Sequence, residues 1–149
     1  LSYIPPRLIQ KAVKLARKLG AQIVLVHGES PVEPVPPGTN HAALLSNIDV
    51  LAHPGFITVQ DVKLAKKNNI LLEITSRKGH AKGNPHVAKK ARATGCPLAF
   101  NTDTHMPENL IDRPGIKKVL SAAHLSFKDF VIMQDHARSL VNKIKKNRR

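Results

Sequence analysis

Residues 48–75, IDVLAHPGFITVQDVKLAKKNNILLEIT, contain two apolar segments separated by one amphipathic segment. The outer segments, IDVLAH and ILLEIT, have the length and composition of buried strands, whereas residues 58–69 place apolar side chains at helical spacing. Thr58 is the expected N-cap of this helix, with Asp61 at the third position inside it. A strand, a helix and a strand in this order predict two parallel strands joined by a crossover helix.

The same alternation extends over most of the chain. Further helices are predicted at residues 4–20, 41–47, 84–95, 116–124 and 127–146. Further strands are predicted at residues 21–27 and 96–102. The fold class is therefore α/β, built from parallel βα units in an open or a closed sheet. We expect one domain over residues 1–149, with a helical, basic part at 114–149.

Composition limits the kinds of partner. The chain has 149 residues with 42% apolar content, enough for a real core, and its single cysteine, Cys96, fits a reducing, cytoplasmic setting. No apolar run reaches the roughly 20 residues of a membrane span. The net charge of +14 has two interpretations, a lysine-rich solvated surface or a polyanionic partner such as RNA. Aromatic residues make up only 3%, which argues against binding of single strands by rows of stacked aromatics.

Potential ligands follow every predicted strand. In parallel βα folds, functional residues gather at the C-terminal ends of the strands, so these side chains are expected to share one site. Imidazole and carboxylate groups together suit Zn²⁺, Mn²⁺ or Fe²⁺. Glu73, inside a predicted strand, needs a buried partner, and one of two interpretations, the less favoured one, places it facing this site. The residues at or just after the strand ends are Glu29, Arg77 and His80, together with His27, His53, Asp103 and His105.

These segments resemble one known family. VHGE at 26–29, DVLAHPG at 49–55, LEITSRKGH at 72–80 and NTDTH at 101–105 resemble the PHP (polymerase and histidinol phosphatase) domain over about residues 1–113, and VEPVPPGTN at 32–40 resembles its histidinol-phosphatase-like subgroup. The resemblance implies a distorted barrel of seven βα units and a phosphoesterase with two or three metal ions. It implies that His27, His53, Asp103 and His105 are metal ligands. It also implies catalytic positions, beside the metal or at the substrate phosphate, for Glu29, Arg77 and His80.

The chain departs from the family pattern at its start. PHP domains begin with an HxH strand, further histidine ligands and a bridging glutamate, whereas this chain opens at LSYIPP, which resembles the stretch just after that glutamate. About three βα units are expected to be missing, either because the chain is a fragment or because it is a truncated descendant. Four ligands suffice for one tetrahedral ion, with weak or no catalysis. An N-terminal segment, a partner chain or a dimer is expected over the open sheet face.

Two functions are predicted. The first is a PHP-type phosphoesterase, in which metal-bound hydroxide attacks a phosphate ester while Arg77 and His80 hold the phosphate. The alternative is a non-catalytic basic PHP-like module that binds RNA, inside a ribonucleoprotein. A stripe of four cations on the first helix supports the alternative, since a phosphatase of small substrates does not need it. These cations are Arg7, Lys11, Lys14 and Lys18.

Overall fold

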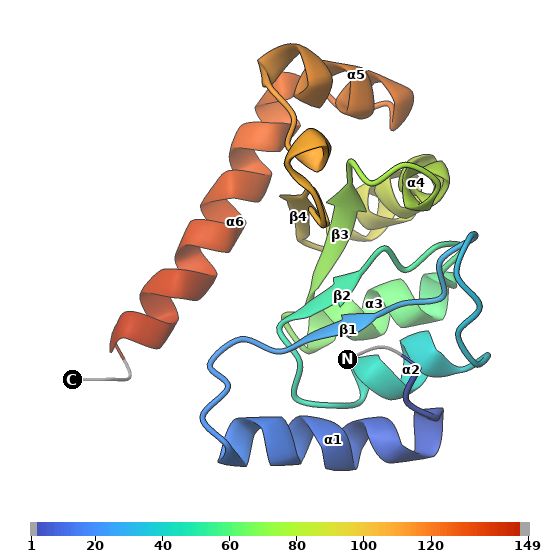
Figure 1. The fold of residues 1–149 in the computed structure, drawn as a ribbon, viewed down its shortest axis with the longest axis vertical. Coiled ribbons are helices and arrows are strands. Elements are labelled where there is room, and N and C mark those ends of the chain that lie inside the picture. Colours follow the sequence, from blue (N-terminus) through green and yellow to red (C-terminus); the bar gives the residue numbers. More distant parts are fainter. Residues whose placement is uncertain (1–2, 147–149) are drawn as a thin grey trace.

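The computed structural model describes residues 3–146 and contains one parallel sheet of four strands in the order β1-β2-β3-β4 (Figure 1). The strands are β1 (Leu25–His27), β2 (Val50–Ala52), β3 (Leu71–Thr75) and β4 (Leu98–Asn101). The α-helices are α1 (Pro6–Lys18), α2 (Thr39–Leu44), α3 (Val59–Lys67), α4 (Asn84–Thr94), α5 (Arg113–Ala122) and α6 (Phe127–Lys146). Two 3₁₀ helices follow β3 and β4, at His80–Gly83 and Pro107–Asn109.

The predicted α/β class with parallel strands is confirmed. Each pair of neighbouring strands is parallel, and Leu25, Val50 and Leu71 lie level across β1, β2 and β3. Within residues 3–146 the sheet is open, with β1 and β4 at its two edges. The barrel and the assignment of residues 1–149 to one partial PHP-like domain remain predictions.

Local sequence signals set the helix ends. The Thr58 hydroxyl accepts a hydrogen bond from the Asp61 backbone N–H, so Thr58 is the N-cap of α3, as predicted. Pro6 opens α1, where a missing N–H costs nothing. Gly95 ends α4 in the left-handed conformation, with φ of 67°.

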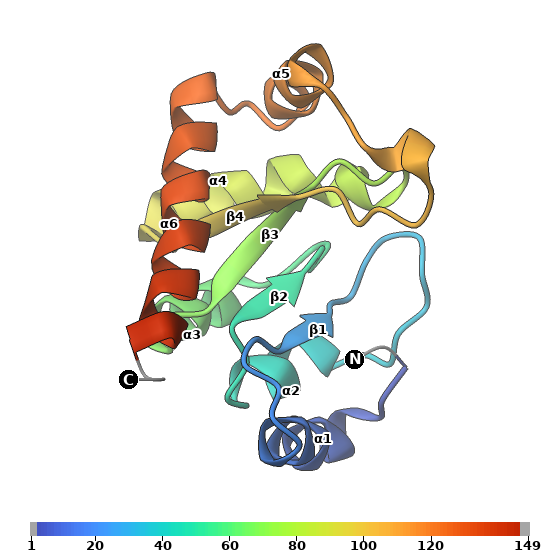
Figure 2. The same cartoon turned by 60° about the vertical axis from the view of Figure 1, so that its left-hand side comes forward.

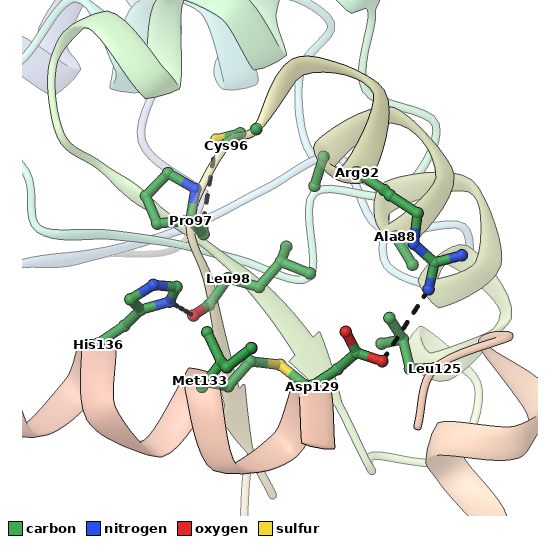
Figure 3. A pocket seen from close by; sticks show the side chains of 12 residues that line it. Ala88, Arg92, Cys96, Pro97, Leu98, Leu125, Asp129, Met133 and His136 are labelled. Atoms are coloured by element: carbon green, nitrogen blue, oxygen red, sulfur yellow. Dashed lines mark hydrogen bonds and ion pairs between the residues drawn. The ribbon is translucent and has the colours of Figure 1, made fainter. Parts of the chain in front are cut away.

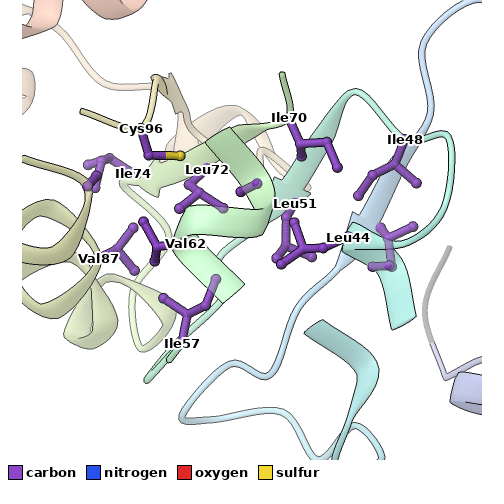
Figure 4. Close-up of a cluster of buried hydrophobic side chains, with 14 of the residues drawn as sticks. Leu44, Ile48, Leu51, Ile57, Val62, Ile70, Leu72, Ile74, Val87 and Cys96 are labelled. Atoms are coloured by element: carbon purple, nitrogen blue, oxygen red, sulfur yellow. The ribbon is translucent and has the colours of Figure 1, made fainter. Parts of the chain in front are cut away.

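The main core lies on one face of the sheet (Figure 4). Leu51 of β2 and Leu72 and Ile74 of β3 pack there against side chains of α2, α3 and α4. Because successive side chains of a strand point to opposite faces, the strand residues next to these in the sequence form a second, smaller cluster on the other face. That cluster contains Val50, Leu71 and Ala99, and Leu140 of α6 packs against it.

Helix α6 runs alongside the β4 edge of the sheet, and α1 lies beyond β1 at the opposite end (Figures 1 and 2). The ring of His136 on α6 binds the Leu98 carbonyl through Nδ1 at 2.9 Å. This contact occupies a backbone acceptor at the edge of the sheet, where an exposed strand would otherwise invite pairing. Helix α6 therefore covers the edge formed by β4.

The first strand is shorter than predicted. Residues 21–27 were expected to form it, but β1 begins at Leu25. Before that point a side chain replaces part of the strand ladder, because Asp49 Oδ2 accepts from the Val24 N–H at 2.7 Å. The same oxygen pairs with the Arg17 guanidinium at 2.5 Å, which ties α1 to the start of β2.

The chain ends in a long basic helix. Residues 142–146 of the predicted basic tail belong to α6, and residues 147–149 lie outside the described residues. In the part of the chain that the structure describes, no helix has the length and apolar character needed to cross a membrane.

Candidate metal centre

Three histidines meet at the C-terminal ends of the strands. His27 is the last residue of β1, His53 directly follows β2, and His80 opens the 3₁₀ helix after β3. Their ligand atoms all lie within 4.8 Å of one another. The ring centroids are 4.4 Å apart for His27 and His53, and 4.3 Å apart for His53 and His80. We call these three residues the histidine cluster.

Each imidazole is oriented by a hydrogen bond through Nδ1. His27 Nδ1 donates to the Gly28 carbonyl at 2.8 Å, and His53 Nδ1 donates to Glu73 Oε2 at 2.7 Å. His80 Nδ1 is hydrogen-bonded to the Ser30 hydroxyl at 2.5 Å. A carbonyl and a carboxylate can only accept, so Nδ1 of His27 and His53 carries the hydrogen, and Nε2 of each neutral ring carries a lone pair. Among the described residues, Nε2 of His27 and of His53 are buried with no hydrogen-bond partner.

Glu73 fixes both the ring and the backbone of His53. The carboxylate is buried, and Oε2 also accepts from the His53 backbone N–H at 2.8 Å. His53 has a φ of 31°, a conformation that costs energy for a residue with a side chain. Two hydrogen bonds to one oxygen hold the residue there. The interpretation that places Glu73 facing the site is confirmed, and metal-ligating histidines commonly have such a carboxylate behind them.

Glu33 faces the histidine cluster from the loop between β1 and α2. Its Oε2 lies 2.8 Å from His27 Nε2, and its Oε1 lies 3.4 Å from His80 Nε2. The first contact is within ion-pair range but lacks hydrogen-bond geometry, which is why the His27 nitrogen has no hydrogen-bond partner. No sequence pattern singles out Glu33, because it lies in a proline-rich loop without periodic spacing.

The other expected ligands lie nearby. Asp103 and His105 line a cleft of about 420 Å³ together with His27, Glu33 and His53. Asp103 has a φ of 50°, and its carbonyl binds His105 Nδ1 at 2.9 Å. The side chain of His105 is 62% exposed. Within the described residues, the group whose ligand atoms all converge contains the three histidines only, so the metal roles of Asp103 and His105 stay predictions.

The three residues with expected catalytic positions differ in their surroundings. Arg77 donates to Asn109 Oδ1 at 2.7 Å and lies 3.8 Å from Asp103 Oδ2, beside the cleft. Glu29 accepts from the Asn40 N–H at 2.9 Å and thereby joins the loop to α2. His80 belongs to the histidine cluster. Burial, and after it the neighbouring His53, lowers the pKa of His80, which favours the neutral form that binds metal.

Three of the remaining histidines, His41, His86 and His136, have side-chain partners away from the cluster. His41 Nδ1 pairs with Asp61 Oδ1 at 2.7 Å, and His86 Nε2 binds the Ile57 carbonyl at 2.8 Å. His41, His86, His124 and His136 all lie outside the cluster.

A second cavity, of about 250 Å³, lies between α4 and α6 (Figure 3). Its charged groups Arg92 and Asp129 lie 4.0 Å apart, and its His136 ring binds the Leu98 carbonyl. Burial raises the pKa of the Cys96 thiol in its wall to about 12, which disfavours the reactive thiolate. This cavity offers packing rather than chemistry.

Comparisons with known proteins found related sequences. No protein-family model matches the chain. The chain is 50% identical over 130 residues to an uncharacterized protein of Methanocaldococcus jannaschii, covering 87% of this chain and 60% of that protein. It is 32% identical over 117 residues to a protein of Shewanella piezotolerans named a probable phosphatase, covering 67% of this chain and 47% of that protein. The chain thus spans about half to three fifths of the length of these relatives.

One solved structure has a similar fold. A chain in a cryo-EM structure of archaeal ribonuclease P with mature tRNA matches with a TM-score of 0.73 and 16% sequence identity. The match covers 96% of this chain and 65% of that chain. At this identity the likeness shows a shared fold.

Proposed function

We propose that the histidine cluster binds one divalent metal ion and that the site hydrolyses phosphate esters in the manner of PHP domains. One observation carries this proposal. Three rings have Nδ1 bound to protein oxygens, one ligand nitrogen of each ring lies within 4.8 Å of the others, and the Nε2 atoms of His27 and His53 are buried without a hydrogen bond in the described residues. A buried polar atom without a partner costs free energy, unless it has a ligand.

The residues fit such an ion. Nitrogen ligands suit Zn²⁺, and also Mn²⁺ or Fe²⁺ when carboxylates join them. A divalent ion supplies a water of lowered pKa and positive charge for phosphate oxygens. His27, His53 and His80 would hold it, and Glu73 would keep the His53 ring in the tautomer that binds through Nε2. Arg77, whose side chain is 29% exposed beside the cleft, can bind phosphate oxygens with its guanidinium. The similarity to the probable phosphatase supports this function.

A second candidate is binding to RNA, inside a ribonucleoprotein. The four cations of the predicted stripe on α1 are all exposed, and α1 contains no acidic residue. Phosphate contacts by such a surface give affinity without reading sequence. The fold shared with a chain of archaeal ribonuclease P supports this candidate. The comparisons favour RNA binding, because the similarity to the ribonuclease P chain covers 96% of this chain. The geometry of the three histidine side chains favours the metal site.

Metal titration tests the first candidate. We expect the chain to bind one Zn²⁺ or Mn²⁺ per molecule, His53→Ala to lose binding, and His41→Ala, the matched control, to keep it. Hydrolysis of p-nitrophenyl phosphate should follow metal content across these variants. If the chain binds no metal, or if His53→Ala and His41→Ala bind alike, the proposed site is wrong.

RNA titration at several salt concentrations tests the second candidate. If phosphate contacts dominate, log K should fall with log[salt] with a slope of roughly −0.7 to −0.9 per neutralised phosphate. Reversing the charges of Lys11, Lys14 and Lys18 should weaken binding and flatten that slope. Binding that ignores these reversals would exclude the α1 stripe as the contact surface.

A further inference from the structure

We infer that Glu33 is a fourth ligand of the metal ion in the histidine cluster, which makes a site of three imidazoles and one carboxylate. This inference rests on the proposed metal site. It adds a residue from a separate loop, and it changes the coordination from three protein ligands to four.

The chemistry of the Glu33–His27 contact points to a cation. Gly28 O accepts the hydrogen of His27 Nδ1, so Nε2 of the neutral ring carries a lone pair. Glu33 Oε2 lies 2.8 Å from that nitrogen, and it is an acceptor as well. Two acceptors attract each other at this distance only with a cation between them, which is a proton or a metal ion. The buried nitrogens and the third imidazole favour the metal ion, because the cluster offers several lone pairs to one centre.

One of the two Glu33 contacts has the spacing of ligands on a tetrahedral ion. With metal–ligand bonds of about 2.0–2.1 Å, the ligand atoms of tetrahedral zinc lie about 3.3 Å apart. Glu33 Oε1 lies 3.4 Å from His80 Nε2, and Oε2 lies 2.8 Å from His27 Nε2. Oε1 therefore lies at ligand spacing from His80, and Oε2 lies closer to His27 than that spacing.

The loop that carries Glu33 is built against the cluster. The Ser30 hydroxyl is hydrogen-bonded to His80 Nδ1. Val32 packs closely on Gly79, since a Cβ built at Gly79 would lie 3.1 Å from Val32 Cγ2. Residues on both sides of Pro31 therefore contact the segment that holds His80. At the start of the loop, a Cβ at Gly55 would lie 1.9 Å from the Glu29 carbonyl. Only glycine permits that approach, and its φ of 60° suits glycine as well. These contacts hold Glu33, 40% exposed, over the histidines.

A fourth protein ligand has a consequence for the site. Zinc sites with four protein ligands are closed, and catalytic sites keep a position for water or substrate. If the ion keeps four ligands, Glu33 would give up its position to an anionic substrate, and the loop at residues 28–38 would connect ligand exchange to substrate entry.

Zinc affinity measured by chelator competition, with Co²⁺ spectra as a second readout, tests the inference on the whole chain. We expect Glu33→Gln to weaken Zn²⁺ binding at least about 10-fold, as substitutions of supporting residues around metal sites already do, and to change the visible Co²⁺ spectrum. Glu108→Gln, with the same charge change at an exposed position, should alter neither. Thermal unfolding without metal checks that both variants fold.

The outcomes separate this inference from the proposed function. If the unsubstituted chain binds Zn²⁺ and Glu33→Gln binds it equally well with an unchanged Co²⁺ spectrum, Glu33 is not a ligand, while the histidine site stands. Equal weakening by Glu33→Gln and Glu108→Gln would also overturn the inference, because it would show a general charge effect. If the unsubstituted chain binds no metal, the proposed function itself fails.

Discussion

Replacing Glu73 with glutamine changes the group that orients His53. The carboxylate accepts three hydrogen bonds, from the His53 backbone N–H, from His53 Nδ1 and from Asn101 Nδ2, at 2.8, 2.7 and 2.9 Å. Glutamine keeps the shape of the side chain but has one acceptor oxygen instead of two. Its NH2 group replaces the second oxygen, so that it faces one of these donors with hydrogens of its own. We therefore expect effects on both stability and metal binding.

The size of the stability effect follows from the three bonds. Hydrogen bonds to a charged group contribute about 1.5–3 kcal/mol each, and neutral ones about 0.5–1.5 kcal/mol, so the substitution loses about 1 kcal/mol per bond. The substitution also removes the free-energy cost of burying the charged carboxylate, which offsets part of this loss. We expect the free energy of unfolding of the metal-free chain to fall by about 2 kcal/mol, which leaves a typical domain folded.

The effect on metal affinity is the decisive one. Loss of a carboxylate behind a ligating histidine typically costs about 10- to 100-fold in metal affinity. Urea unfolding and Zn²⁺ titration of Glu73→Gln would measure the two effects. Asp61→Asn is the matched control. Asp61 pairs with His41 Nδ1 at 2.7 Å, the same distance as in the Glu73–His53 pair, and this pair lies outside the histidine cluster. Zinc affinity of Glu73→Gln equal to that of Asp61→Asn would refute the role of Glu73.

Three further predictions concern the fold. Leu51→Ala, at a fully buried position of β2, should lower the free energy of unfolding, measured in urea, by about 2–5 kcal/mol. Leu45→Ala, at a residue that is 57% exposed, should change it by less than about 0.5 kcal/mol. Similar losses in the two variants would contradict the assignment of Leu51 to the core. Cys96 should resist iodoacetamide at about pH 8 in the native chain and react in denaturant, since burial raises its pKa to about 12. Equal labelling rates in the two states would show that the thiol is accessible. Hydrogen bonds from Ser126 lower the pKa of Asp129 below its usual 3.8, so Asp129 stabilises the fold above that pH, and the stability is lost as the pH falls through the lowered pKa. The stability difference between the unsubstituted chain and Asp129→Asn should therefore shrink with acid, and a difference constant with pH would exclude this role.

Much of the fold followed from local patterns. Strand and helix periods in residues 48–75 predicted β2, α3 and β3, and the Thr58 cap was placed correctly because capping depends on neighbouring residues. The start of β1 was wrong for the opposite reason. The Val24 N–H binds Asp49, 25 residues away, and no local pattern reports such a bond.

The site divides in the same way. His27 and His53 were expected together because both end strands of a parallel sheet, whose C-terminal ends share one edge. That a buried carboxylate at Glu73 needs a partner also follows from its place in an apolar run. The sequence by itself therefore determined the βα order, the edge of the sheet that carries the candidate site, and the presence of His27, His53 and His80 at that edge. Only the tertiary structure decided that His53 is the partner of Glu73, that His80 lies within 4.8 Å of His27 and His53 as a third ligand group, and that Glu33 faces this cluster. The Glu73–His53 pair joins residues 20 positions apart, and the Ser30–His80 bond joins residues 50 positions apart. Such contacts are made through loops, where direction depends on packing and hydrogen bonds rather than on any repeating pattern.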